Sequence, residues 1–229
     1  MPVLEAIVFD FDGTILDTET PDFQTWQEVY RNHGAELPLD VWLQCVGGGT
    51  GEFRPDSYLE ELLGREIDRE RVRTERRKRF LDLIHVMPIM PGVVALIDAA
   101  ERRGVRLAVA SSSDRKWVES HLKRLGLFGR FAAIVTADDV ERVKPDPALY
   151  RLAAQKLGVM PKRAIAIEDS YNGMLGAQRA GLRCVSVPNC ITRESDFSGA
   201  DLCLDSIACM APDDLIASFD REESERQSP

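Results

Sequence analysis

Short apolar runs alternate with helical patterns along most of this chain, and no other feature of the sequence constrains its fold as strongly. Helical patterns after residue 88 are expected at 91–103, 114–125, 146–157, 172–180 and 207–219. The apolar runs predict strands at residues 3–9, 105–110, 131–136, 163–167, 184–187 and 201–204. Strands and helices at this spacing form right-handed βαβ units. The predicted class is therefore α/β, with a doubly wound parallel sheet covered by helices.

One long stretch interrupts this alternation. Between residues 19 and 86 the pattern is helical, with helices expected at 19–33, 38–46, 55–63 and 68–86 and a glycine-rich loop at 47–51. Such an insertion directly after the first strand predicts a separate all-helical cap, with an active site between the cap and the sheet edge. We expect a core of residues 1–15 and 88–220, a cap of 16–87, and a disordered polar tail of 221–229. The linkers are expected near 15–18 and 87–91.

Composition and charge limit the classes of protein that the chain can belong to. Its 229 residues are enough for one domain with an insertion, and a net charge of −9 argues against a general nucleic-acid binder. No apolar stretch reaches the length of a membrane span, and no signal peptide is evident. The five cysteines form no CxxC pair and read as free thiols in a reducing compartment. We therefore expect a cytoplasmic monomer without nucleic-acid or membrane partners.

The first strand ends in two carboxylates. The apolar run at 3–9 is followed by Asp10 and Asp12, and Gly13 comes next. Ligands of open α/β sheets bind at the carboxyl ends of the strands. Two acids placed so close together repel each other unless a cation or a shared proton offsets the repulsion. This pattern favours chemistry over packing.

Three further polar groups follow later predicted strands, and each has a simpler structural explanation when taken alone. Ser111 to Ser113 suit a helix cap, as Asp12 and Gly13 suit a turn. The residues after Lys144 suit a helix start, and Glu168 and Asp169 suit solvated loop acids. Taken together at one sheet edge, the groups supply four acids, a lysine, hydroxyls and helix N-termini.

Such a set suits the transfer of a phosphoryl group. Hydroxyls and helix N-termini bind phosphate, and three or four carboxylate oxygens suit Mg²⁺. The lysine can neutralise a phosphoryl oxygen or a nucleophilic carboxylate, and an aspartate can attack phosphorus to give an aspartyl-phosphate. We therefore expect Mg²⁺ as the cofactor and a small phosphorylated metabolite as the partner.

The four groups, in this order, resemble those of the haloacid dehalogenase superfamily of phosphohydrolases, subfamily I. The resemblance implies a Rossmann-like core. It implies that Asp10 is the nucleophile and a metal ligand, and that Asp12 is the general acid and base, with its backbone carbonyl on the metal. It further implies that Ser111 and Lys144 hold the phosphoryl group, and that Glu168 and Asp169 complete the Mg²⁺ site.

Within this superfamily, residues 15–19 and 168–173 are similar to the beta-phosphoglucomutase branch, which includes sugar-phosphate phosphatases. The mutase carries a histidine where this chain has Asp22, and a basic residue in the loop where this chain has residues 47–51. A mutase must bind a second phosphate group while its bisphosphate intermediate reorients, whereas hydrolysis requires only one phosphate site. We therefore favour a phosphatase. A phosphosugar mutase and a catalytically silent binding protein are the alternatives, and a dehalogenase needs no such metal site. The arginines of the helix at 68–86 read as a solvated face.

Overall fold

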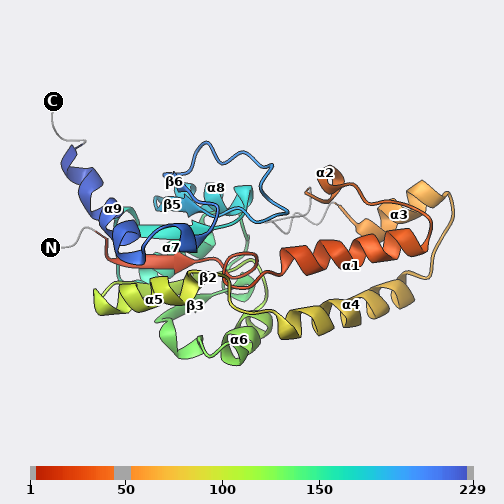
Figure 1. The fold of residues 1–229 in the computed structure, drawn as a ribbon, viewed down its shortest axis with the longest axis horizontal. Coiled ribbons are helices and arrows are strands. Elements are labelled where there is room, and N and C mark those ends of the chain that lie inside the picture. Colours follow the sequence, from red (N-terminus) through yellow and green to blue (C-terminus); the bar gives the residue numbers. More distant parts are fainter. Residues whose placement is uncertain (1–3, 44–52, 226–229) are drawn as a thin grey trace.

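A six-stranded parallel sheet lies at the centre of the computed structural model, which describes residues 4–43 and 53–225 (Figure 1). Its strands, in the order β3-β2-β1-β4-β5-β6, are β3 (Ala133–Val135), β2 (Arg106–Ala110), β1 (Ala6–Phe9), β4 (Ala164–Glu168), β5 (Arg183–Ser186) and β6 (Leu202–Cys203). Strands β2 and β3 follow on one side of β1, and β4, β5 and β6 then follow on the other. This order confirms the predicted Rossmann-like, doubly wound sheet.

Helices cover both faces of the sheet because successive side chains of each strand point to opposite faces. Ile7 and Phe9 of β1 pack on the face that carries α5 (Val93–Arg102), α6 (Arg115–Arg124) and α9 (Pro212–Glu225). Ala6 and Val8 pack on the other face, beneath α7 (Ala148–Leu157) and α8 (Tyr171–Ala180). Many of the strand residues on this second face are alanines, so α7 and α8 lie close to the backbone of the sheet.

Four helices form a group to one side of the sheet (Figure 1). They are α1 (Glu19–Asn32), α2 (Leu39–Trp42), α3 (Pro55–Leu63) and α4 (Arg69–Val86). This group has its own apolar cluster, in which Trp26, Trp42 and Leu59 are buried. Helix α4 joins both parts, because its Val72 lies in that cluster and its Phe80 lies in the cluster of the sheet. No helix of the described ranges is long and apolar enough to cross a membrane.

The chain leaves and re-enters the sheet at neighbouring positions. The amide of Met90 donates to the carbonyl of Ile15 at 2.9 Å, and Leu16 forms an isolated antiparallel bridge with Ile89. The two segments expected as linkers therefore lie side by side. This arrangement holds the four helices above the carboxyl end of β1.

The end of the chain differs from the prediction. The expected helix at 207–219 is divided into a 3₁₀ turn, Ile207–Cys209, and α9, which begins at Pro212. Proline suits the first position of a helix and disfavours the helical conformation in the residue before it, so the division falls here. Helix α9 then continues to Glu225, where the sequence predicted a disordered tail from residue 221, because 213–225 contains no glycine or proline. The end of that tail, 226–229, lies outside the described residues.

In the cap, helix α2 ends at Trp42, before the predicted end at residue 46. Residues 44–46 and the predicted loop at 47–51 lie outside the described residues.

Candidate active site

The sheet brings three carboxylates from two neighbouring strands together. Phe9 of β1 pairs with Ile167 of β4, so Asp10 lies beside Glu168, and Asp169 follows. Each of the three acids offers an oxygen within 4.8 Å of the others. All three are buried, with at most 6% of the residue exposed. The register of the strands thus brings together acids that lie more than a hundred residues apart in the sequence.

Lys144 is the cation of this cluster. Its ammonium group is buried and pairs with the carboxylate of Asp10 and, at 2.6 Å, with that of Glu168. Burial acts to lower the pKa of Lys144, but Asp10 and Glu168 outweigh this effect and raise the pKa above its usual value. The two carboxylates thus favour the charged form of this buried ammonium group.

Glu168 and Asp169 are each fixed by neighbours. The hydroxyl of Tyr150 donates to Oε1 of Glu168, and the hydroxyl of Ser170 donates to Oε2 at 3.2 Å. The side-chain amide of Asn189 donates to Oδ2 of Asp169 at 2.7 Å. These hydrogen bonds hold the carboxylates of Glu168 and Asp169 in place.

Two glycines make room for this cluster. A Cβ at Gly173 would lie 1.9 Å from Oε2 of Glu168, and a Cβ at Gly13 would lie 2.1 Å from Oδ2 of Asp169. Gly13 also has a φ of +76°, in the left-handed region that side chains disfavour. Gly13 therefore serves packing around the cluster as well as the turn.

The charges of the cluster are unbalanced. Burial, and next the carboxylate of Glu168, raise the pKa of Asp10 to about 8, although Lys144 acts in the opposite direction. Burial, followed by Asp10, also raises the pKa of Asp169 well above its usual value. Three buried carboxylates thus face one lysine. An all-oxygen donor set of this kind fits a hard divalent cation such as Mg²⁺, whose charge would offset the repulsion.

Asp12 lies beside the three acids but faces different partners. Its Oδ2 accepts hydrogen bonds from the hydroxyl groups of Ser113, at 2.7 Å, and Ser111, at 3.2 Å. Its Oδ1 accepts from the indole Nε1 of Trp117 at 2.8 Å. The side chain of Asp12 is therefore directed by three donors from the end of β2 and the start of α6. Trp117 is a site residue that the sequence analysis missed.

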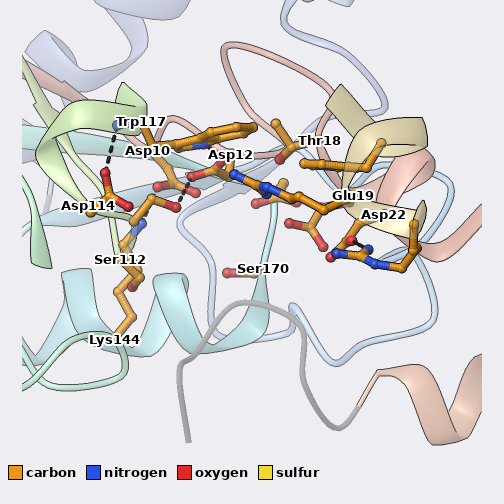
Figure 2. Close-up of a pocket in the computed structure, with 15 residues that line it drawn as sticks. Asp10, Asp12, Thr18, Glu19, Asp22, Ser112, Asp114, Trp117, Lys144 and Ser170 are labelled. Carbon is orange, nitrogen blue, oxygen red and sulfur yellow. Dashed lines mark hydrogen bonds and ion pairs between the residues drawn. The ribbon is translucent and has the colours of Figure 1, made fainter. Parts of the chain in front are cut away.

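A cavity of about 340 Å³ opens in front of these residues, between the sheet edge and the four helices. Figure 2 shows Asp10, Asp12 and Trp117 at one end of this cavity and Glu19 and Asp22 at the other. The first end is supplied by strand ends, and the second by α1 and α4. We call them the core end and the cap end.

Ser112 and Ser113, and not Ser111, line the cavity. The buried hydroxyl oxygen of Ser112 has no hydrogen-bond partner in the described part of the chain, and the same is true of Thr18 across the cavity. Buried polar groups are seldom left unpaired, so these hydroxyls are suited to bind oxygens of a ligand. The sequence analysis expected Ser111 to hold the phosphoryl group; its hydroxyl contacts Asp12, and that role stays a prediction.

Two arginines of α4 line the cavity; the side chain of Arg76 is mostly buried, contrary to the expected solvated face, whereas Arg77 is exposed as expected. Arg76 pairs with Asp22 and lies 4.8 Å from the ring centroid of Trp26. Arg77 lies 5.1 Å from the ring centroid of Trp117 and has no carboxylate partner among the described residues. Both precede Phe80 by one helical turn, on the face that packs toward the sheet. That spacing was the signal that the prediction overlooked.

The side chains of the other arginines are largely exposed, as expected of a solvated face, and several pair with cap acids. Arg69 pairs with Glu60, Arg73 with Asp56, and Arg79 with Glu28 at 3.4 Å. Their contacts tie α4 to α1 and α3. The arginines of α4 thus fall into two groups. One group pairs with acids of the neighbouring cap helices, and the other lines the cavity.

Comparison with known proteins places the chain among phosphohydrolases. The family model described as "Haloacid dehalogenase-like hydrolase" matches residues 7–187. A Bacillus subtilis (strain 168) protein named "Putative phosphatase YhcW" is 48% identical over 91% of this chain and 94% of its own length. The "Phosphorylated carbohydrates phosphatase" of Thermotoga maritima is 30% identical over 78% of this chain and 82% of its own length.

A solved structure is similar over nearly the whole chain. It is a mutant of CbbY from Rhodobacter sphaeroides in complex with xylulose-(1,5)bisphosphate, with 32% identity and a TM-score of 0.69. The match covers 90% of this chain and 95% of that one. The chain therefore belongs to the haloacid dehalogenase-like hydrolase family and is, within it, a hydrolase of phosphate esters.

Proposed function

We propose that this protein is a Mg²⁺-dependent phosphatase that acts on a small, sugar-like phosphomonoester through an aspartyl-phosphate on Asp10. The observation that carries this proposal is the buried cluster of Asp10, Glu168 and Asp169 with a single lysine. Asp10, Glu168 and Asp169, together with the backbone carbonyl of Asp12, would hold the metal ion. The ion would supply positive charge that lets a phosphate dianion approach the acids.

Two proton transfers by Asp12 complete the reaction. A carboxylate oxygen of Asp10 forms a bond to phosphorus while the bond between phosphorus and the leaving oxygen breaks. Asp12 gives its proton to that leaving oxygen. It then takes a proton from the water that attacks the aspartyl-phosphate, which releases inorganic phosphate and restores Asp10.

The remaining polar groups would bind the phosphoryl oxygens. The ammonium group of Lys144 lies within reach of Asp10 and balances charge as the bond to phosphorus forms. Ser112 lines the cavity and its buried hydroxyl has no hydrogen-bond partner among the described residues, so we assign it this role beside Ser111. A sugar-like substrate agrees with the size of the cavity and with the names of two similar proteins, one a carbohydrate phosphatase and one bound to a sugar bisphosphate.

A phosphosugar mutase is the second candidate, and Arg77 is the observation that favours it. This arginine gives the cap end a cation that lacks an ion-pair partner among the described residues. Two carboxylates at the same end, Glu19 and Asp22, would oppose a second phosphate, and Asp22 already engages Arg76. We therefore place hydrolysis first.

The test is a screen of phosphate release from sugar monophosphates and bisphosphates, nucleotides and phosphoglycolate, with and without Mg²⁺. We expect release that requires Mg²⁺, and a loss of about 10³-fold or more in kcat for Asp10→Asn. Asp98→Asn is the matched control, because Asp98 pairs with Arg130 on the surface, away from the cavity. Full activity of Asp10→Asn would contradict the proposal. A primer-dependent hexose phosphate isomer as the main product, from a hexose 1-phosphate and a bisphosphate, would favour the mutase.

A further inference from the structure

We infer that Trp117 is a positioning residue for Asp12, and that Phe80 of the cap helix α4 holds its indole ring in place. This inference rests on the proposed function, because it concerns the proton that Asp12 gives to the leaving group. It links the packing of the cap to the chemistry at the core end.

Trp117 completes the set of contacts that fixes the Asp12 carboxylate. Oδ1 accepts from the indole Nε1 at 2.8 Å, while the two serine hydroxyls donate to Oδ2. With one oxygen held on each side, the carboxylate group cannot rotate without losing a hydrogen bond. The serines hold only Oδ2, so removal of the indole N–H would free Oδ1.

The indole ring is itself held from both parts of the molecule. On the core side, the Asp114 side chain accepts from the backbone N–H of Trp117 at 2.7 Å, which fixes the first turn of α6. On the cap side, the ring of Phe80 stacks on the indole, with centroids 5.8 Å apart and an angle of 17° between the planes. The imidazole ring of His121 packs edge-on against the indole, with ring centroids 4.2 Å apart. A shift of α4 would therefore move the indole, and with it the donor to Asp12.

The indole N–H that donates to Asp12 distinguishes Trp117 from a residue that only packs. Phenylalanine would keep the stack with Phe80 but has no N–H to donate. The other two tryptophans, Trp26 and Trp42, lie in the apolar cluster of the cap and do not line the cavity. Trp42→Phe is thus a matched control that removes an indole N–H elsewhere.

The experiment compares two substrates whose leaving groups differ in their need for a proton. We would measure kcat/KM for a sugar phosphate of the alkyl type found active in the screen, and for p-nitrophenyl phosphate. The value of kcat/KM reports the steps up to the loss of the leaving group, and nitrophenolate leaves without protonation. Trp117→Phe is expected to lower kcat/KM about 10-fold for the alkyl substrate, because general acid catalysis contributes about 10²–10⁴-fold in all. The loss on p-nitrophenyl phosphate is expected to be much smaller.

The ratio of the two values does not depend on how much of a variant is folded, so partial unfolding cannot imitate the result. Phe80→Leu, which removes the stack but keeps an apolar side chain, is expected to lower the same ratio by less. If Phe80 acts through the indole, the double variant loses no more than Trp117→Phe alone. Trp42→Phe is expected to leave the ratio unchanged.

Equal losses on both substrates, or no loss in Trp117→Phe, would overturn the role of Trp117. Additive losses in the double variant would overturn the role of Phe80. A wild-type protein that released no phosphate from any substrate would instead contradict the proposed function, so the two failures are distinguishable.

Discussion

The core end and the cap end of the cavity are built in opposite ways. At the core end, Asp10 and Glu168 come directly from strand ends, are buried, and pair with the ammonium group of Lys144. At the cap end, Asp22 projects from α1, and Arg76 and Arg77 extend on long side chains from α4. The register of the parallel strands fixes the positions of the two core-end acids relative to each other. The groups suited to the reaction therefore lie at the core end of the cavity, and the groups suited to select a substrate lie at the cap end.

The two ends also differ in charge. The core end holds the carboxylates of Asp10, Asp12, Glu168 and Asp169 against one lysine, whereas at the cap end Asp22 is paired with Arg76. Like charges that remain buried without compensation destabilise a fold, so the core end has a physical need for a cation. Changes at the core end should therefore affect stability and activity together, and changes at the cap end should affect substrate preference.

The largest expected effect is that of a methyl group added at the core end. Gly173→Ala places a Cβ 1.9 Å from Oε2 of Glu168, which lacks room to retreat because Lys144 and Tyr150 hold the carboxylate. We expect a loss of about 3 kcal/mol in the free energy of unfolding and nearly complete loss of phosphate release. Urea unfolding and the phosphatase assay measure both. In the control Gly129→Ala, a Cβ meets no atom within 4 Å, so a change of no more than about 0.5 kcal/mol is expected.

Metal binding should stabilise the protein through the core end alone. Addition of Mg²⁺ at 100 times its dissociation constant is expected to raise the free energy of unfolding by about 2.7 kcal/mol, because the ion binds the folded state. Asp169→Asn should lose this gain, and Arg77→Gln, at the cap end, should keep it. Thermal unfolding with Mg²⁺ and with EDTA measures the shift. An equal shift in Asp169→Asn and the wild type would show that the ion binds elsewhere.

The smallest effect is expected at the cap end and should depend on the substrate. Arg77→Gln removes a cavity cation that has no ion-pair partner among the described residues, so kcat/KM should fall about 10-fold, or about 1.4 kcal/mol, for a sugar bisphosphate. The fall should be smaller for the monophosphate of the same sugar. Lys78→Gln is the control, because Lys78 is a neighbouring exposed cation of α4 that does not line the cavity. Equal losses on both substrates would remove Arg77 from substrate selection.

The core end was more predictable than the cap end for a local reason. Asp10, Lys144, Glu168 and Asp169 each follow a predicted strand, and the carboxyl ends of parallel strands share one edge. The structure brings these four together as the sequence analysis expected. Their roles in catalysis and metal binding stay predictions.

Arg76, Arg77 and Trp117 were not predicted because helical residues reach a cavity only through packing. The sequence of α4 has charged residues on all sides, so the spacing of Arg76 and Arg77 from Phe80 was a weak sign of the face that turns inward. The indole of Trp117 meets Asp12 only because β1 and β2 are neighbours and α6 follows β2. This second contact has no local signature.

By itself, the sequence determined the alternation of strands and helices, the helical insertion after β1, and the acids at the strand ends, because each depends on the pattern of nearby residues. Only the tertiary structure decided that Ser112 lines the cavity, that Asp22 pairs with Arg76, and that Trp117 donates to Asp12. Such contacts depend on how helices settle against the sheet. That docking is set by the packing of many apolar side chains at once, and no single segment of the chain encodes it.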